Sequence, residues 1–482
     1  MILAPFVFDL ASFAGAVVTA FRRPYRSLRY NLALSVFLTI VLGLLVFVRL
    51  MQLFDHLLFP GYHRQPIEAP IYILATPRSG TTFLHRLLCL DEQFTTFQLW
   101  HTLVPSILMM RVTRALARID THLGGPFRRV IHGINHLSFK GWEGMHAMGL
   151  DRTEEDEFLW VNTNLTPSIA LWFPFLHRLD KARFVDRLPE RMRSRLARYY
   201  RDALKRQLYA VGQGKRLLVK SALAGGRIRT MLEAVPDMRI VYLVRHPYDA
   251  IPSLLSMFTK PWRWHSSHLR LDGPEGQAFA QLGIDYYKAM YRLRQELPPE
   301  QYIEFRYDDL IADPQSAIEC MYAHFGIPLS HDFRTRLEAE VRRAQQYNSN
   351  HAYDLAEYGL TREFIADELT EVLAHYGFPV EWMRSRPDFT AHVPPERQDQ
   401  ATALYRHPKR YRQETKAPLR QANIPSASAS LTRAILHRCR APRPRRKLYI
   451  PLARKSNHKC IVVKNLRLVA TFPNISYNDY VP

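Results

Sequence analysis

The chain has 482 residues, of which 47% are hydrophobic and 23% are charged, and this composition is typical of a globular protein and excludes a fibrous or fully disordered one. The net charge is +22, but residues 401–482 alone hold 18 Lys and Arg against two acidic residues, so the preceding 400 residues carry only +6. That smaller excess suits an anion-binding cleft and needs no specific nucleic-acid partner. The four cysteines show no spacing typical of a disulfide framework or a metal site, so no metal is expected.

An apolar segment opens the chain. The run 31–48 is uncharged and approaches the ~20 residues that cross a bilayer, and arginines precede it at 22, 23, 26 and 29. We therefore expect residues 1–54 to be a membrane-associated or transmembrane segment, with a single-pass helix as the first interpretation. An interfacial helix and a core helix of a soluble domain are the alternatives. The side of the membrane on which the remaining chain lies is left open.

A strand, a tight turn and a helix follow one another near residue 75. Residues 71–75 are predicted to form a buried parallel strand, and an amphipathic helix is expected from Thr81 onward. This arrangement directs backbone N–H groups and the positive end of a helix dipole at an anion. The spacing is that of the phosphate loop G-x-x-x-x-G-K-[ST], yet Thr81 stands at the lysine position and the cation is Arg78. The loop is predicted to bind phosphate, but not that of a magnesium-bound nucleoside triphosphate.

A second phosphate site is predicted downstream. Residues 239–244 form another apolar run of strand length, which ends at Arg245 where a magnesium-dependent phosphate-loop enzyme carries an acidic residue. Pro247 suits the first turn of a helix. Arg245 and Ser253 then present a guanidinium group and a hydroxyl to a phosphate. Two separate phosphate positions without a metal carboxylate argue against ATP.

At these residues the chain resembles the sulfotransferase superfamily, whose members transfer a sulfuryl group from 3′-phosphoadenosine 5′-phosphosulfate (PAPS). The segment 77–82 looks like the family's 5′-phosphosulfate loop, and Arg245 with Ser253 looks like its 3′-phosphate site. The resemblance extends over residues 53–378 and implies a P-loop-like α/β fold with a central parallel sheet flanked by helices. Further blocks that carry it are 217–221 with 236–237, 303–310 with 313–314, and 351–360. The cofactor-binding residues that it implies are Arg78, Ser79, Gly80, Thr81, Thr82, Arg245 and Ser253.

The stretch of about 90–215 between the two phosphate sites has helical periodicity and many aromatic residues. In an α/β fold such an insertion is a natural place for an acceptor pocket, outside the carboxyl ends of the strands. Ordinary helical core is the alternative interpretation. The aromatic residues concerned are Trp100, Trp142, Trp160, Trp172, Phe173 and Phe175.

The chemistry requires cations near the bridging oxygen to the 5′-phosphate, where charge develops as an acceptor oxygen attacks in line. Arg78 and Lys220, which ends its own predicted strand, are the catalytic cations that we expect. A strand-end lysine without a catalytic role is the alternative for Lys220.

A base must take the proton of the acceptor. The resemblance points to His101, because relatives carry glutamate after the tryptophan that matches Trp100, and histidine titrates near neutrality. The acidic run 154–157 is a rival, although it suits a helix cap or an anchor of the insertion as well. His246 and His85 are weaker candidates.

The expected domains are 1–54, a sulfotransferase domain at 55–400, and a basic, disordered tail at 401–482. The function expected from the resemblance is transfer of a sulfuryl group to a hydroxyl or amine of a small-molecule, lipid or glycan acceptor. Two alternatives are kept: a catalytically silent, membrane-anchored nucleotide-binding protein, and a P-loop kinase that uses a nucleoside triphosphate.

Overall fold

The computed structural model describes residues 7–139, 149–344 and 354–378. The chain divides into two units, Met1–Cys439 and Arg440–Pro482, and every described residue belongs to the first. The expected boundary at residue 400 and the expected disordered tail at 401–482 lie outside the described residues.

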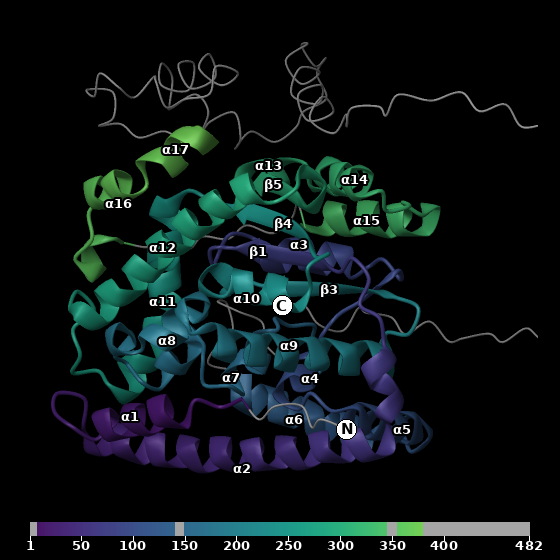
Figure 1. Ribbon diagram of the computed structural model, residues 1–482, viewed down its shortest axis with the longest axis horizontal. Helices are drawn as coiled ribbons and strands as arrows, with labels where there is room; N and C mark the ends of the chain where they lie inside the picture. Colours follow the sequence, from purple (N-terminus) through teal and green to yellow (C-terminus); the bar gives the residue numbers. More distant parts are fainter. Residues whose placement is uncertain (1–6, 140–148, 345–353, 379–482) are drawn as a thin grey trace, which may run out of the picture. The chain divides into compact units, whose positions relative to one another are not determined.

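A five-stranded parallel sheet forms the centre of the first unit, in the order β2-β3-β1-β4-β5 (Figure 1). The register pairs Ala75 with Leu243 and Val244 with Arg306, so the carboxyl ends of β1, β4 and β5 lie at one edge. This confirms the predicted α/β fold with a central parallel sheet. The strands are β1 Ile71–Ala75, β2 Phe94–Thr95, β3 Arg216–Ser221, β4 Arg239–Val244 and β5 Tyr302–Arg306.

Helices cover both faces of the sheet, which explains why β1 is apolar at every position. Tyr72 and Leu74 pack in one core cluster with α9, α10, α11 and α12, while Ile71 and Ile73 pack in a second cluster with α3, α14 and α15 (Figure 1). These helices are α3 Thr81–Leu88, α9 Glu190–Val211, α10 Ile228–Ala234, α11 Pro247–His265, α12 Pro274–Glu296, α14 Pro314–Phe325 and α15 His331–Ala344.

The predicted helical insertion lies between β2 and β3. Its aromatic residues fall into a buried group and a partly exposed group. Trp160, Phe173 and Phe175 are buried in the core, while Trp100 and Trp172 are partly exposed. Trp142 lies outside the described residues. The helices before α9 are α4 Leu99–Leu103, α5 Ile107–His122, α6 Pro126–Phe139, α7 Glu157–Val161 and α8 Asp180–Arg183. After β5 come α13 Tyr307–Ala312, α16 Arg362–Glu368 and α17 Thr370–Tyr376.

Two apolar helices precede the sheet, α1 Leu10–Ala20 and α2 Leu28–Leu58. By length and composition α2 is, within the described part of the chain, the helix that could cross a membrane, and most of its apolar surface is exposed. The segment is not separate from the domain, since Phe13, Tyr30 and Leu34 belong to the core cluster on one face of the sheet. The expected boundary between residues 54 and 55 falls inside α2.

Candidate active site

The loop after β1 is a tight turn held by its own backbone. Arg78 has φ 74° and Gly80 has φ 86°, and both values lie in the left-handed region. A left-handed arginine costs about 1–2 kcal/mol, a strain that is typical of functional loops. The Ser79 hydroxyl donates to the carbonyl oxygen of Thr76 at 2.8 Å and closes the turn. A Cβ at Gly80 would lie 2.8 Å from the Tyr307 ring, so glycine is required there.

The loop leads directly into α3. Gly80 is the N-cap residue and supplies no side-chain hydrogen bond, so the first N–H groups of α3 have no capping side chain. Thr81 is buried, whereas the side chain of Thr82 is exposed beside the turn. The helix N-terminus presents the backbone N–H groups from which the sequence analysis predicted anion binding.

Arg78, Arg245 and Ser253 meet at this loop although they lie far apart in the sequence. Arg78 Nε donates to Ser253 Oγ at 3.1 Å, and Arg245 Nη1 donates to the Arg78 carbonyl oxygen at 3.0 Å. The Arg245 guanidinium lies over the Tyr307 ring at 4.9 Å, and its Nε is 3.9 Å from Asp249 Oδ2. That Nε is buried and has no hydrogen-bond partner among the described residues. Two guanidinium groups at the carboxyl edge of the sheet suit a ligand with two anionic groups.

Lys220, at the end of β3, lies on the other side of the same loop. Its Nζ is 2.9 Å from Glu154 Oε1, 3.6 Å from Glu155 Oε1 and 3.3 Å from Thr82 Oγ1. Burial acts to lower the pKa of Lys220, but the two carboxylates outweigh it and the pKa is raised. Lys220 is therefore a permanent cation that reaches the N-terminus of α3.

In the acidic run 154–157, the last two residues, Asp156 and Glu157, contact a different cation, Arg227. Glu157 Oε2 is 2.6 Å from Arg227 Nη2, and Asp156 accepts a hydrogen bond from Tyr200 at 2.6 Å. Arg227 is buried and lies over the Trp160 ring at 4.7 Å. These two acids therefore anchor the insertion to the core, which is one of the two structural roles that the sequence analysis considered for the run 154–157.

His101, the residue we expected as the base, lies in α4 with its lone pair engaged. Its Nδ1 accepts the backbone N–H of Gln98 at 3.2 Å in a reciprocal capping box. Burial, with a contribution from Arg114, lowers the pKa of His101 to about 3. A neutral ring that accepts at Nδ1 carries its proton on Nε2, so this geometry leaves no free nitrogen lone pair to take a proton.

The two weaker candidates for the base, His85 and His246, have structural partners. His85 Nε2 lies 2.8 Å from Thr96 Oγ1, and burial lowers the pKa of His85 to about 3. His246 accepts the backbone N–H of Tyr248 at 3.2 Å and caps α11. In the described part of the chain no cluster of acidic, histidine and cysteine residues is suited to a metal ion.

The structure thus brings together all the residues predicted around the phosphates, with Lys220 on the opposite side of the loop. Sequence reasoning did not assign Tyr307, whose ring closes on both Gly80 and Arg245. Its position directly after β5, level with the end of β4, is the signal that would have found it. Sequence reasoning also did not pair Glu154 with Lys220, although it named the acidic run.

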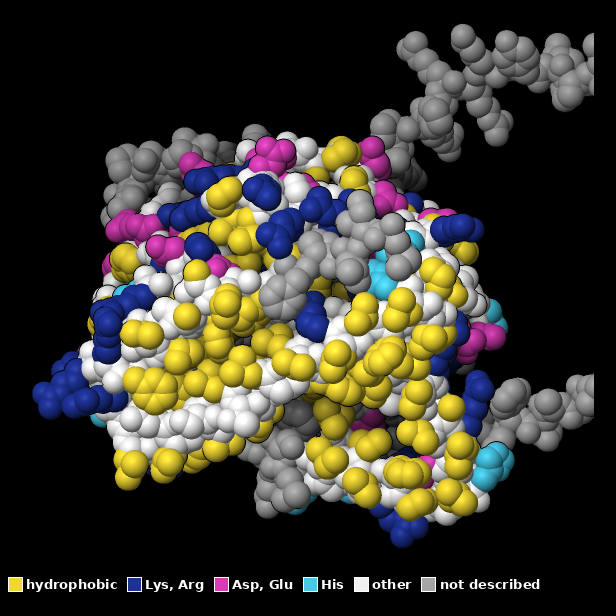
Figure 2. Space-filling model, turned by 60° about the horizontal axis from the view of Figure 1, so that its bottom comes forward, with side chains coloured by type: hydrophobic (Ala, Val, Ile, Leu, Met, Phe, Trp, Pro, Cys, Tyr) yellow, Lys and Arg dark blue, Asp and Glu magenta, His cyan; other side chains and the backbone are white. Residues whose placement is uncertain are grey.

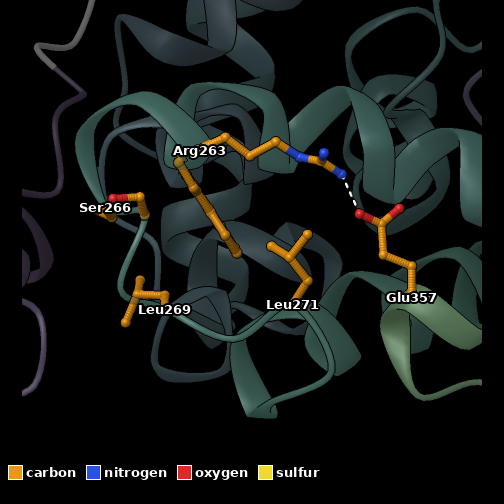
Figure 3. Close-up of a pocket in the computed structure, with 7 residues that line it drawn as sticks. Arg263, Ser266, Leu269, Leu271 and Glu357 are labelled. Carbon is orange, nitrogen blue, oxygen red and sulfur yellow. Dashed lines mark hydrogen bonds and ion pairs between the residues drawn. The ribbon is translucent and has the colours of Figure 1, made fainter.

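A small pocket lies elsewhere, at the end of α11. Its volume is about 200 Å³, and an ion pair between Arg263 and Glu357 closes one side (Figure 3). Ligand pockets typically measure about 300–1,000 Å³, and no residue of the phosphate loop lines this one. It is not the candidate nucleotide site.

Comparison with known proteins agrees with this geometry. The model of the sulfotransferase family matches residues 70–332, from the start of β1 into α15. The chain belongs to the sulfotransferase family. The omega-hydroxy-beta-dihydromenaquinone-9 sulfotransferases Stf3 of Mycobacterium bovis and Mycobacterium tuberculosis are each 26% identical over 322 residues, which cover 64% of this chain and 76% of theirs.

Solved sulfotransferase structures share the fold. Sulfotransferase STF9 from Mycobacterium avium aligns with a TM-score of 0.56 and 21% identity, over 69% of this chain and 82% of its own. Sulfotransferase STF1 from Mycobacterium tuberculosis aligns with a TM-score of 0.50 and 20% identity, over 75% and 98% of the two chains. Family membership leaves the kinase alternative without support.

Proposed function

We propose that this sulfotransferase moves a sulfuryl group from PAPS to a hydroxyl group of a lipid-soluble acceptor. The observation that carries the donor is the pair of guanidinium groups of Arg78, which is part of the anion-binding loop, and Arg245, which donates to the carbonyl oxygen of Arg78. PAPS has anionic groups at its 5′ and 3′ positions, and two separated cations match that pattern. The buried Arg245 Nε without a hydrogen-bond partner supports this fit.

In this proposal the loop holds the 5′-phosphosulfate through the backbone of Ser79, Gly80 and Thr81 and the hydroxyl of Thr82. Arg245 and Ser253 hold the 3′-phosphate. The Ser79 hydroxyl stabilises the turn through its bond to Thr76, so we assign the phosphate contact of Ser79 to its N–H group.

Transfer forms a bond between the acceptor oxygen and sulfur and breaks the bond from sulfur to the 5′-phosphate oxygen. The acceptor proton passes to a base, and 3′-phosphoadenosine 5′-phosphate leaves. Lys220 and Arg78 stabilise the charge that develops on the bridging oxygen, where each such donor typically contributes about 10²–10³ in rate.

We propose Glu154 as the base in place of His101. Its carboxyl group lies beside Lys220, with Oε1 2.9 Å from the ammonium nitrogen. Arrival of the anionic donor offers Lys220 a competing partner, so Lys220 shifts toward the bridging oxygen and leaves Glu154 able to accept the acceptor proton. His101 is the competing candidate, and its engaged Nδ1 argues against it.

A lipid-soluble alcohol is the acceptor class that we favour. The curated relatives are named for a hydroxylated dihydromenaquinone. In this chain the backbone N–H of Glu154 donates to the carbonyl oxygen of Phe97 just before α4, and α4 is followed within four residues by α5, on which Val112, Leu116 and Ile119 are exposed. An acceptor with an apolar body and a terminal hydroxyl suits that neighbourhood, and we place the acceptor pocket in the insertion.

The test is calorimetric titration of 3′-phosphoadenosine 5′-phosphate into the full chain in EDTA, beside ATP with magnesium. Tight binding of the bisphosphate and weak binding of ATP are expected, and Arg245→Ala should lower the affinity at least tenfold. Arg263→Ala is the matched control, because Arg263 lies in the last turn of α11, the helix that follows Arg245, and pairs with Glu357 away from the loop. A preference for ATP, or equal effects of the two substitutions, would overturn the donor assignment. Binding without transfer of labelled sulfate to any lipid alcohol would indicate the catalytically silent protein.

A further inference from the structure

After Tyr30, helix α2 carries its charged side chains on the face toward the protein and its apolar side chains on the outer face, which is the reverse of a surface helix in a water-soluble protein. Its charged residues after Tyr30, Arg49 and Asp55, face the protein body, whereas its outer face carries only apolar residues with Ser35, Thr39 and Gly43. Val36, Ile40 and Val46 are each 62% exposed. The outer face of a soluble surface helix is normally polar and charged. The outer face of α2 is therefore suited to contact with an apolar surface.

The body of the protein is attached along α2 rather than at one end of it. Tyr30 Oη donates to the Trp172 carbonyl oxygen at 2.8 Å near the start of the helix. Asp55 forms a buried ion pair with Arg206 at 3.3 Å near its end. These contacts are 25 residues apart, about 37 Å at 1.5 Å per residue. The hydrocarbon core of a bilayer is about 30 Å thick, so a spanning α2 would carry the attached body into it.

The hairpin of α5 and α6 presents two more apolar faces to the outside. The exposed residues Val112, Leu116, Ile119 and Leu123 follow one another at helical spacing on α5 and the residue after it. On α6 the exposed residues at the same kind of spacing are Phe127, Val130, Ile131 and Ile134. Figure 2 shows apolar side chains gathered in a broad band over the face that includes α2. Contiguous apolar surface of this kind marks an interaction site.

The exposed charged side chains on α1, α2, α5 and α6 themselves are arginines. Residues 10–54 contain five arginines and no acidic residue. In the hairpin at 107–136 five arginines are exposed, while the single acidic residue, Asp120, is buried and accepts the N–H groups of Phe127 and Arg128. A second copy of the chain would bring these arginines against one another. Anionic phospholipids complement them.

We propose that α1, α2, α5 and α6 together form a monotopic membrane surface that lies in the plane of one leaflet, with none of these four helices crossing the bilayer. The apolar faces contact acyl chains and the arginines contact lipid phosphates. Because Glu154 donates its backbone N–H to Phe97 just before α4, and α5 begins four residues after α4, this surface also brings the candidate active site to the leaflet, which rests on the proposed function. Membrane binding itself needs neither PAPS nor an acceptor.

The first test is flotation of the full chain with vesicles of phosphatidylcholine alone or with 30% phosphatidylglycerol. Binding should be stronger to the anionic vesicles, and Leu116→Glu/Ile119→Glu should lower the bound fraction at least tenfold. Ala117→Glu/Thr121→Glu is the matched control, because it adds the same charge to exposed positions on the other side of α5. Equal loss in both variants, or no binding by the parent chain, would overturn the proposal. So would a stable dimer in light scattering that Leu116→Glu/Ile119→Glu dissociates.

The second test distinguishes an in-plane surface from a single-pass anchor. A protease recognition sequence is inserted in the turn between α1 and α2, after Arg22, and in a second variant in the exposed loop at Ser330. Sealed membrane vesicles from the expressing cells are then treated with the protease, with and without detergent. Both sites should be cut, or both protected, in vesicles of one orientation. Cleavage of one site and protection of the other would show a spanning helix.

Discussion

The acidic run at 154–157 contacts two cations in two different surroundings. Its first two residues, Glu154 and Glu155, contact Lys220, and the Nζ of Lys220 also donates to Thr82 at the N-terminus of α3. Thr82 is exposed, so this ion pair borders a site that a ligand can enter.

The next two residues contact Arg227 in a closed environment. Glu157 also accepts hydrogen bonds from Thr166 and Ser168, and Arg227 is covered by Trp160. Every one of these groups is buried or nearly so, and no ligand can reach them.

The comparison separates an ion pair that can exchange its partner from one that cannot. Paired charges out of reach of solvent and ligand serve the fold, since removal of one partner leaves a buried charge. Paired charges at the edge of an anion site can be rearranged by the anion itself. We therefore expect substitutions on the Lys220 side to lower activity and substitutions on the Arg227 side to lower stability.

The largest expected effect is that of Glu154→Gln on turnover. A glutamine keeps the size of the side chain and an oxygen for Lys220 but cannot take the acceptor proton. Loss of a general base typically costs about 10²–10⁴-fold, so kcat with PAPS and a lipid alcohol should fall by that factor. The affinity for 3′-phosphoadenosine 5′-phosphate should change by less than about threefold.

Glu157→Gln is the matched control for this prediction, since it is the same chemical change three residues away. It should lower the free energy of unfolding and leave kcat per folded molecule near that of the parent. Equal kcat values for the two variants would remove Glu154 from the proposed mechanism.

The second expected effect is on stability, from Arg227→Met. Methionine fills part of the volume but leaves Glu157 and Asp156 without their cation in a buried site. Breaking such a pair costs about 3–5 kcal/mol, to be measured by urea unfolding at pH 7. A double variant Arg227→Met/Glu157→Gln should recover part of that loss. A loss below about 1 kcal/mol for the single variant would mean that the pair is not structural.

Gly80→Ala should lower the affinity for the bisphosphate about 10²-fold. The new Cβ would lie 2.8 Å from Tyr307 in a left-handed turn, so the loop must move by about an ångström away from its anion geometry. Calorimetry on Gly80→Ala and on Gly80→Ala/Tyr307→Ala separates the two causes. Removal of the ring should restore part of the affinity if contact with Tyr307 matters, and none if only the left-handed backbone does.

The phosphate loop could be predicted because its strand, turn and helix are contiguous in the sequence. The contact of Arg78 with Ser253, 175 positions apart, was not predicted, because the two residues were assigned to separate phosphate positions. The rule that parallel strands end at one edge of a sheet explains why their segments lie close together. The pairing of Glu154 with Lys220 could not be predicted, because residues 149–156 form no periodic element whose direction the sequence specifies.

For helix α2, too, the sequence could not predict the tertiary contacts. An apolar run reports that a segment avoids water, but not whether protein or lipid covers each side. Only the contacts of Tyr30 and Asp55 with the body show that one side of α2 belongs to the core. For His101 the sequence indicated a histidine near the site, but the capping bond to Gln98 that engages its lone pair depends on the start of α4.

The smallest expected effect is that of His101→Asn, which tests whether His101 acts as a cap or as a base. Asparagine can still accept the Gln98 N–H group, so kcat/KM should change by less than about threefold. Because the pKa of His101 is lowered to about 3 in the folded protein, the unfolded chain binds a proton below pH 6.5 that the folded chain does not. His101 therefore costs stability as the pH falls from 6.5 toward 3, and His101→Asn should lose about 2 kcal/mol less than the parent between pH 7 and pH 5. A loss of turnover above about 10²-fold, with unchanged pH dependence of unfolding, would instead make His101 the base and return Glu154 to a partner of Lys220.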